Sequence, residues 1–186
     1  MTGASGSVYA RALVAALART DAELHLVATA WAERVWREEL GGELAAWTAS
    51  LGPGRLLVHD PEDLAAPVSS GSFRLDGTVV VPCSSGTLGA LAASLAGNLV
   101  QRAGSVALKE GWPLVLVTRE TPLSLPALRA MVALKEAGAA ILPACPGFYS
   151  RPSGIDELAL QIAHRALDLL GSPDPGASRW YGGGEE

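Results

Sequence analysis

Two loops rich in glycine and hydroxyl residues are places where a phosphate could bind. Residues 2–7 open directly into an Ala/Leu-rich segment with helical spacing, and residues 82–87 repeat this arrangement after the β-branched run 78–81. Free backbone N–H groups and the helix dipole favour an anion at such helix starts. Each loop could instead simply cap its helix. Because ligands of open α/β sheets bind beyond the carboxyl ends of the strands, the two loops could hold opposite ends of one nucleotide-like ligand.

Two further segments carry polar groups after buried strands. Arg119 and Glu120 follow the apolar run 114–117, and Tyr149 lies in an aromatic loop after the run 139–142. The planar arginine fork suits a phosphate, and the carboxylate could move a proton. A structural ion pair is the alternative for Arg119 and Glu120. The phenol of Tyr149 could donate to a phosphate oxygen, or the loop could serve only for packing.

Two more cations lie on predicted helices. Arg165 is close to an apolar stripe of the segment 155–170. Burying an unpaired cation there would be costly, so we expect Arg165 to meet either a carboxylate or a bound anion. Lys109 ends another helical segment, where a lysine also suits the helix dipole. The three histidines share no ligand spacing, which argues against a metal site.

The order of the predicted elements indicates the fold that must position these groups. Short β-branched runs alternate with Ala/Leu-rich stretches, which predicts an α/β fold with parallel strands and crossover helices. We expect strands at 24–28, 55–58, 78–81, 113–118 and 139–142, and helices at 8–17, 31–40, 125–137 and 155–170. The stretch 87–110 reads as one or two helices with a break at 97–98.

The chain starts at a glycine-rich turn that a buried strand normally feeds. The first strand of the sheet is therefore missing from this sequence. Either the start is truncated or misassigned, or another segment covers the resulting gap.

Length and composition predict one domain at residues 1–171, followed by a Gly/Pro-rich tail at 172–186. The formal net charge of −5 argues against nucleic acid as a partner. With no apolar run long enough for a membrane span and no signal peptide, we expect a soluble, cytoplasmic protein. Cys83 and Cys145 are both expected to be buried thiols.

Five blocks of the chain, in their order and spacing, closely resemble the UbiX family of flavin prenyltransferases. They are residues 2–6, 82–88, 102–110, 113–123 and 146–149. The resemblance implies a three-layer Rossmann- or flavodoxin-like subunit in a homododecamer, with active sites at subunit interfaces. It also implies a metal-independent reaction that joins the dimethylallyl group of dimethylallyl monophosphate to N5 and C6 of reduced FMN. The prenylated FMN would pass to a UbiD-type decarboxylase, in pathways such as ubiquinone biosynthesis.

The resemblance also implies roles for individual residues. FMN would be contacted by Gly3, Ala4, Ser5, Thr29, Ser84, Ser85, Gly86, Thr87 and Arg119. The prenyl phosphate would be bound by Lys109, Tyr149, Arg165 and Trp180. The catalytic set would be Glu39, Lys109, Arg119, Glu120, Tyr149 and Arg165, with Glu38 adjacent to the aligned glutamate. Competing interpretations are an FMN-dependent cysteine decarboxylase of the same superfamily and a flavin-binding protein without catalysis.

A cationic cradle fits the implied chemistry. Ionising an allylic phosphate leaves negative charge on the departing group, so preorganised Lys, Arg and Tyr side chains stabilise charge where it develops. A dry pocket lined by aromatic groups would shield the allylic cation.

Overall fold

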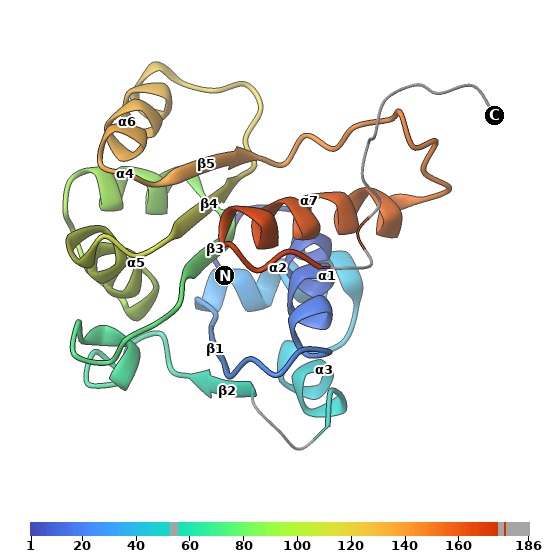
Figure 1. Ribbon diagram of the computed structural model, residues 1–186, viewed down its shortest axis with the longest axis horizontal. Helices are drawn as coiled ribbons and strands as arrows, with labels where there is room; N and C mark the ends of the chain where they lie inside the picture. The colour runs from blue at the N-terminus through green and yellow to red at the C-terminus, as the bar shows by residue number, and fades with distance from the viewer. Residues whose placement is uncertain (53–55, 175–176, 178–186) are drawn as a thin grey trace.

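The computed structural model describes residues 1–52, 56–174 and 177. The helices are α1 (Ser7–Leu17), α2 (Ala30–Leu40), α3 (Leu44–Ser50), α4 (Ser85–Ala92), α5 (Leu99–Glu110), α6 (Leu125–Glu136) and α7 (Ile155–Leu169), with a 3₁₀ turn, η1 (Pro67–Ser69). The strands are β1 (Leu24–Val27), β2 (Leu56–His59), β3 (Thr78–Cys83), β4 (Leu114–Thr118) and β5 (Ala140–Pro143). Figure 1 shows the strands at the centre of the subunit with helices around them.

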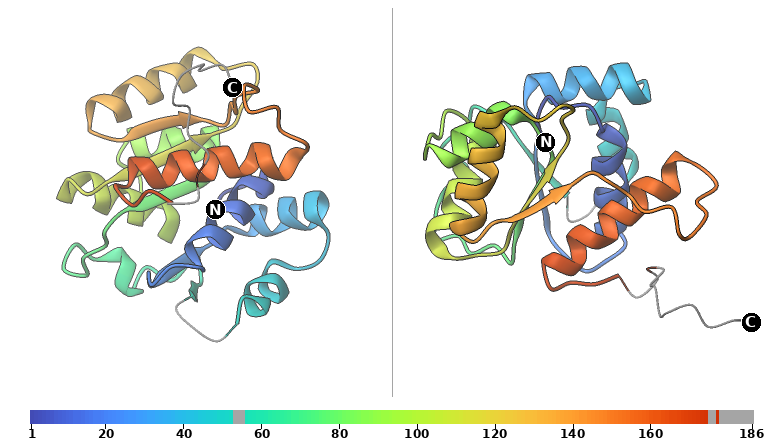
Figure 2. Two further views of the ribbon diagram at one scale, coloured as in Figure 1. Left: turned by 45° about the vertical axis from the view of Figure 1, so that its right-hand side comes forward. Right: turned by 90° about the horizontal axis from the view of Figure 1, so that it is seen from above.

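Helices cover both faces of the larger sheet because β4 is apolar on both sides. Val115 and Val117 pack into a core with α1 and α7, whereas Leu114 and Leu116 pack into a second core with α4, α5 and α6. Successive side chains of a strand point to opposite faces, so this alternation produces two cores. Seen from above in Figure 2, the sheet separates two helical layers. The three-layer α/β fold predicted from the sequence is confirmed.

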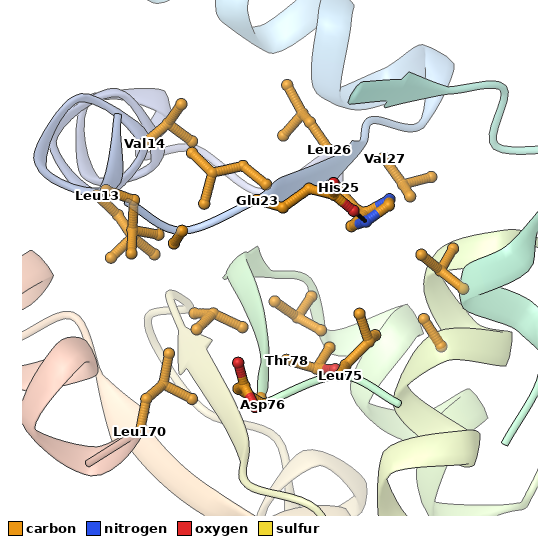
Figure 3. Close-up of a pocket in the computed structure, with 18 of the residues that line it drawn as sticks. Leu13, Val14, Glu23, His25, Leu26, Val27, Leu75, Asp76, Thr78 and Leu170 are labelled. Carbon is orange, nitrogen blue, oxygen red and sulfur yellow. Dashed lines mark hydrogen bonds and ion pairs between the residues drawn. The ribbon is translucent and has the colours of Figure 1, made fainter. Parts of the chain in front are cut away.

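The strands form two separate parallel sheets. One contains β1 and β2, and the other has the order β3-β4-β5. Residues at the start of the chain bridge them: the Met1 carbonyl accepts from Thr29 N at 3.2 Å, and Thr2 N donates to the Pro82 carbonyl at 3.3 Å. Among the described strands, β1 and β3 are therefore linked through Met1 and Thr2 and are not paired with each other. Figure 3 shows residues of both strands lining a cavity of about 380 Å³.

Most predicted elements form, with local differences. The stretch 87–110 divides into α4 and α5, and Asn98 caps α5 by accepting from Gln101 N at 3.0 Å. The short helix α3 was not predicted. The prediction that both cysteines are buried is wrong for Cys145, which is exposed. Cys83 is buried, and burial raises the pKa of its thiol to about 12. Within the described residues, no helix has the length and apolar character to cross a membrane.

Candidate active site

The two hydroxyl-rich loops lie side by side at the carboxyl ends of the strands. The Thr2 hydroxyl donates to the Pro82 carbonyl at 2.7 Å and accepts from Ser84 N at 2.8 Å, and it is almost fully buried. Ser84 in turn caps α4 by accepting from Thr87 N at 3.3 Å. Hydrogen bonds between the loops thus bring the N-termini of α1 and α4 together.

A third helix start joins them through Thr29. Its backbone N–H donates to Met1, and its hydroxyl caps α2 by accepting from Ala32 N at 3.2 Å. The packing is close here: a Cβ on Gly3 would lie 2.5 Å from the Cβ of Trp31. Glycine at position 3 is therefore needed for the first loop to approach α2.

Glu39 occupies the anion position at the start of α1. Its carboxylate accepts from Gly6 N at 3.0 Å and from Ser7 N at 2.7 Å, and the Ser5 hydroxyl also donates to it. Partial burial is the largest single influence and opposes ionisation, but the hydrogen bonds together lower the pKa of Glu39. The neighbouring Glu38 instead pairs with Arg34 at 2.9 Å on the exposed face of α2. Of the two adjacent glutamates, Glu39 is the one that faces the loop.

Arg119 and Glu120 connect β4 to the two loops separately. Arg119 Nε donates to the Ser5 carbonyl at 2.9 Å, and Glu120 accepts from the Ser85 hydroxyl at 3.2 Å. The two side chains thus contact different loops, whereas the alternative considered from the sequence was an ion pair between them. Their position after β4 agrees with the prediction that they lie at a strand's carboxyl end.

A cavity of about 820 Å³ opens beside the first loop. Its lining includes Ser5, Tyr9, Glu39 and Arg119, together with Ile155 at the start of α7. This volume lies within the range of about 300–1,000 Å³ for ligand sites. Ser5, Tyr9 and the Arg119 guanidinium line the cavity and offer polar groups that suit a ligand such as FMN, which combines a phosphate with a polar ring edge.

Tyr9 is a cavity residue that the sequence analysis missed. Its ring packs against Gly6, where an added Cβ would lie 2.8 Å from Cδ2 of the ring. Gly6 also has φ +116°, a conformation that favours glycine. Burial, followed by the nearby Cys145, raises the pKa of Tyr9, although Arg119 opposes the shift. An aromatic residue on the first turn after a glycine-rich loop was the available signal.

Two of the described groups expected to bind a prenyl phosphate, Lys109 and Arg165, lie far from Arg119. Lys109 ends α5 near the start of β4, whereas Arg119 follows its end; the five residues of β4 span about 17 Å. Arg165 lies ten residues along α7 from Ile155, a rise of about 15 Å. Tyr149 is 90% exposed. Trp180 lies outside the described residues.

The position of Arg165 differs from the one expected from the sequence. It was expected to be held against an apolar stripe, but its side chain is 61% exposed, and Asp168 lies 3.7 Å away. On α7 it falls just outside the buried face formed by Ile162, Ala163 and Ala166. A guanidinium so placed keeps much of its hydration, so the cost of burial does not require an anion within this subunit. Lys109 is similarly half exposed and contacts Glu110 at 2.6 Å.

In the described part of the chain, no group of three or more His, Cys, Asp or Glu side chains could hold a metal ion. The site at the carboxyl ends of the strands therefore consists of backbone N–H groups, hydroxyls, two carboxylates, a phenol and a guanidinium.

Comparison with known proteins agrees with the fold. Residues 1–147 match the Flavoprotein family, so the chain is a flavoprotein of α/β type. Flavin prenyltransferase UbiX of Deinococcus radiodurans is 46% identical over 97% of this chain and 90% of its own length. Flavin prenyltransferase UbiX of Synechocystis is 40% identical over 100% of this chain and 95% of its own length. The chain belongs to the UbiX family of flavin prenyltransferases.

Solved structures give the same result. AnUbiX (PadA1) in complex with FMN and dimethylallyl pyrophosphate superposes with a TM-score of 0.92 at 42% identity, over 99% of this chain and 96% of that one. A dodecameric FMN-dependent UbiX-like decarboxylase from Escherichia coli O157:H7 has a TM-score of 0.90 at 41% identity, over 98% of this chain and 100% of that one. The cysteine decarboxylase TvaF, at 21% identity and a TM-score of 0.56, shares the fold alone.

Proposed function

We propose that this chain transfers the dimethylallyl group of a dimethylallyl phosphate to N5 and C6 of reduced FMN, producing prenylated FMN. The observation that carries this proposal is the meeting of three helix starts at the carboxyl ends of the strands, where Ser5 and Arg119 also line a cavity of about 820 Å³. The related structure with both FMN and dimethylallyl pyrophosphate bound supports the same pair of substrates.

The flavin would lie against the loops at the carboxyl ends of the strands. The first loop, Thr29, the second loop and Arg119 surround this position, and their donors suit a phosphate and a flavin carbonyl edge. The residues assigned to FMN are Gly3, Ala4, Ser5, Thr29, Ser84, Ser85, Gly86, Thr87 and Arg119. Gly3 acts through the close approach of its loop to Trp31.

The prenyl phosphate would be held by cations from more than one subunit. Lys109 and Arg165 lie far from Arg119 along β4 and α7, and Tyr149 is 90% exposed. Assembly into a homododecamer would bring these groups to the flavin of a neighbouring subunit. The dodecameric state of the related Escherichia coli protein supports this arrangement.

Each group in the assembled site has a distinct task. Lys109, Tyr149 and Arg165 would stabilise the negative charge of the departing phosphate, with Trp180 beside the prenyl group. Glu39 and Glu120 are the carboxylates available to accept a proton, and the Ser5 hydroxyl that donates to Glu39 connects this carboxylate to the flavin loop. Bound FMN supplies the nucleophilic ring atoms.

The product would serve a UbiD-type decarboxylase as its cofactor. We propose dimethylallyl monophosphate as the donor, as the family resemblance implies. The activity would reside in a single domain at residues 1–171, with the tail at 172–186 contributing Trp180. The protein would act in the cytoplasm, where reduced flavin is available.

Mass spectrometry of the extracted flavin tests the proposal. Purified protein given FMN, a reductant and dimethylallyl monophosphate under anaerobic conditions should yield a flavin heavier by one prenyl unit. A parallel reaction with dimethylallyl pyrophosphate identifies the donor, and a reaction without protein measures the background. Unmodified FMN after complete reduction, from protein that still binds FMN, would contradict the enzyme assignment and favour a flavin-binding protein without catalysis.

A further inference from the structure

The loop at 144–154 connects β5 to α7 and carries Tyr149. Figure 1 shows this loop in orange, extending past the end of the sheet to the start of α7. Its tip is a tight turn in which Arg151 N donates to the Phe148 carbonyl at 3.0 Å. Arg151 has φ +51°, which is unfavourable for a residue other than glycine, so the turn needs support from outside. Because the Tyr149 side chain is exposed, its position depends on how the backbone of this loop is held.

Gln161 on α7 holds this turn at two points. Its carboxamide oxygen accepts from Gly147 N at 2.9 Å, and its amide nitrogen donates to the Ser150 hydroxyl at 3.1 Å. The orientation of the carboxamide follows from its chemistry, because a backbone N–H can only donate and must therefore meet the oxygen. The two contacts lie on either side of Phe148 and Tyr149 in the chain. One side chain thus fixes both ends of the dipeptide that includes Tyr149.

The same carboxamide lies close to the Tyr149 ring and to Arg165. A Cβ on Gly147 would lie 3.6 Å from Cδ2 of Tyr149 and 3.7 Å from Oε1 of Gln161, so the ring and the carboxamide are both neighbours of this glycine. Arg165 follows Gln161 by four residues on α7. Side chains at this spacing are neighbours on one side of a helix, with Cβ atoms about 5–6 Å apart. Gln161 therefore places the loop of Tyr149 one helical turn from Arg165.

We propose that Gln161 is a positioning residue for prenyl transfer, which holds the Tyr149 loop so that the Tyr149 phenol and the Arg165 guanidinium contact the same phosphate. This inference rests on the proposed function, in which both groups bind the departing phosphate. Gln161 does not touch the substrate in this role. If the turn is released, only a fraction of the molecules hold Tyr149 in position, and the apparent affinity for the prenyl phosphate falls with that fraction. Saturating substrate draws the loop back, so kcat changes little.

Steady-state kinetics of Gln161→Leu test this role. Leucine is similar in size and favours a helix, but it lacks both hydrogen-bonding groups. We expect KM for dimethylallyl monophosphate to rise about five- to tenfold, as for the loss of one or two neutral hydrogen bonds, with kcat and the Kd for FMN changed less than about twofold. Ser150→Ala removes only one of the two bonds and should have a smaller effect. Ser150→Thr is the matched control, because it keeps a hydroxyl, and its KM should be close to that of the unaltered protein.

The same substitution in a Tyr149→Phe background separates positioning from a general effect on the fold. If Gln161 acts through the Tyr149 hydroxyl, Gln161→Leu should raise KM by less than about twofold once this hydroxyl is gone. A five- to tenfold rise in that background would overturn the proposal, because Gln161 would then act through another group. An unchanged KM in Gln161→Leu alone would overturn it as well.

Hydrogen exchange tests the hold on the loop without turnover. Exchange of the Arg151 amide, which bonds to Phe148 and not to Gln161, should be at least about threefold faster in Gln161→Leu than in the unaltered protein. If this is found but the unaltered protein makes no prenylated FMN, the proposed function fails, whereas the hold of Gln161 on the loop stands. Prenyl transfer by the unaltered protein, with equal Arg151 exchange in both proteins, would leave the proposed function intact and overturn the role of Gln161.

Discussion

The loops at the carboxyl ends of the strands and the dispersed cations differ in how they are positioned. Thr2, Ser84 and Glu39 are each held by hydrogen bonds from another segment of the same subunit. Lys109 and Arg165 are largely exposed and contact only near neighbours in sequence among the described ion pairs. In the proposed site, the flavin half would thus be preorganised by the fold, whereas the geometry of the phosphate half would depend on assembly.

Replacing Arg165 tests this division most directly. We expect Arg165→Ala to lower kcat by about 10²–10³-fold, the usual loss for one donor that stabilises developing charge. FMN affinity should change less than about threefold, because Arg165 is remote from the flavin loops. Prenyl transfer followed by mass spectrometry gives kcat, and flavin fluorescence gives the FMN dissociation constant.

Arg129 provides a matched control, because it is also an exposed arginine within a helix, α6. Arg129→Ala should leave both constants close to those of the unaltered protein. Loss of FMN from folded Arg165→Ala would place this residue in the flavin half and contradict the comparison.

Mixed oligomers test whether one site takes residues from two subunits. Arg119→Ala and Arg165→Ala are each expected to be inactive, since one lies in each half of the site. When the two variants are co-expressed in equal amounts, half of the flavin halves would keep Arg119, and half of the adjoining phosphate halves would keep Arg165. About a quarter of the sites would then have both residues, so we expect about a quarter of the full activity. Activity is measured on purified mixed oligomers. No recovery, despite confirmed mixing of the two variants, would mean that Arg119 and Arg165 of the same subunit act together.

Sequence reasoning was most successful for residues whose position follows from the order of strands, loops and helices along the chain. The strand, loop and helix pattern located both hydroxyl loops and Arg119 at one edge of the sheet, because parallel strands expose their carboxyl ends together. It misjudged Arg165, since a spacing of three or four residues from apolar positions does not say on which side of the buried stripe a residue lies. Tyr9 was missed because an aromatic residue in an amphipathic helix usually belongs to the core. The sequence could not tell which of the adjacent residues Glu38 and Glu39 faces the first loop, because this depends on how α2 is rotated about its axis.

The flavin half should be sensitive to small steric changes. Gly3→Ala would place a Cβ 2.5 Å from that of Trp31, so the loop or α2 must shift. We expect a loss of about 1–3 kcal/mol in the free energy of unfolding, as for other overpacked sites, together with weaker FMN binding. Denaturant unfolding and flavin fluorescence measure the two effects.

Gly89→Ala is the matched control for this substitution. Gly89 lies within α4, and a Cβ there would meet nothing within 4 Å. This variant should be stabilised by about 0.4–1 kcal/mol and should bind FMN normally. If Gly3→Ala behaves in the same way, the first loop is not held closely against α2. The proposal that the fold preorganises the flavin half of the site would then lose its support.

The smallest expected effect concerns the charge of Glu39. Hydrogen bonds lower its pKa in the folded protein, so the folded state favours the ionised carboxylate more than the unfolded state does. This stabilisation is fully present above the unfolded pKa of about 4.3 and is lost as the pH falls through the lower, folded value. Because the carboxylate is partly exposed, we expect less than about 1 kcal/mol. Unfolding of the unaltered protein and of Glu39→Gln, compared from pH 3 to pH 7, should therefore differ at neutral pH and converge in acid. A constant difference over this range would show that the amide fails to replace the carboxylate for steric reasons, and that charge at the start of α1 does not hold the loop.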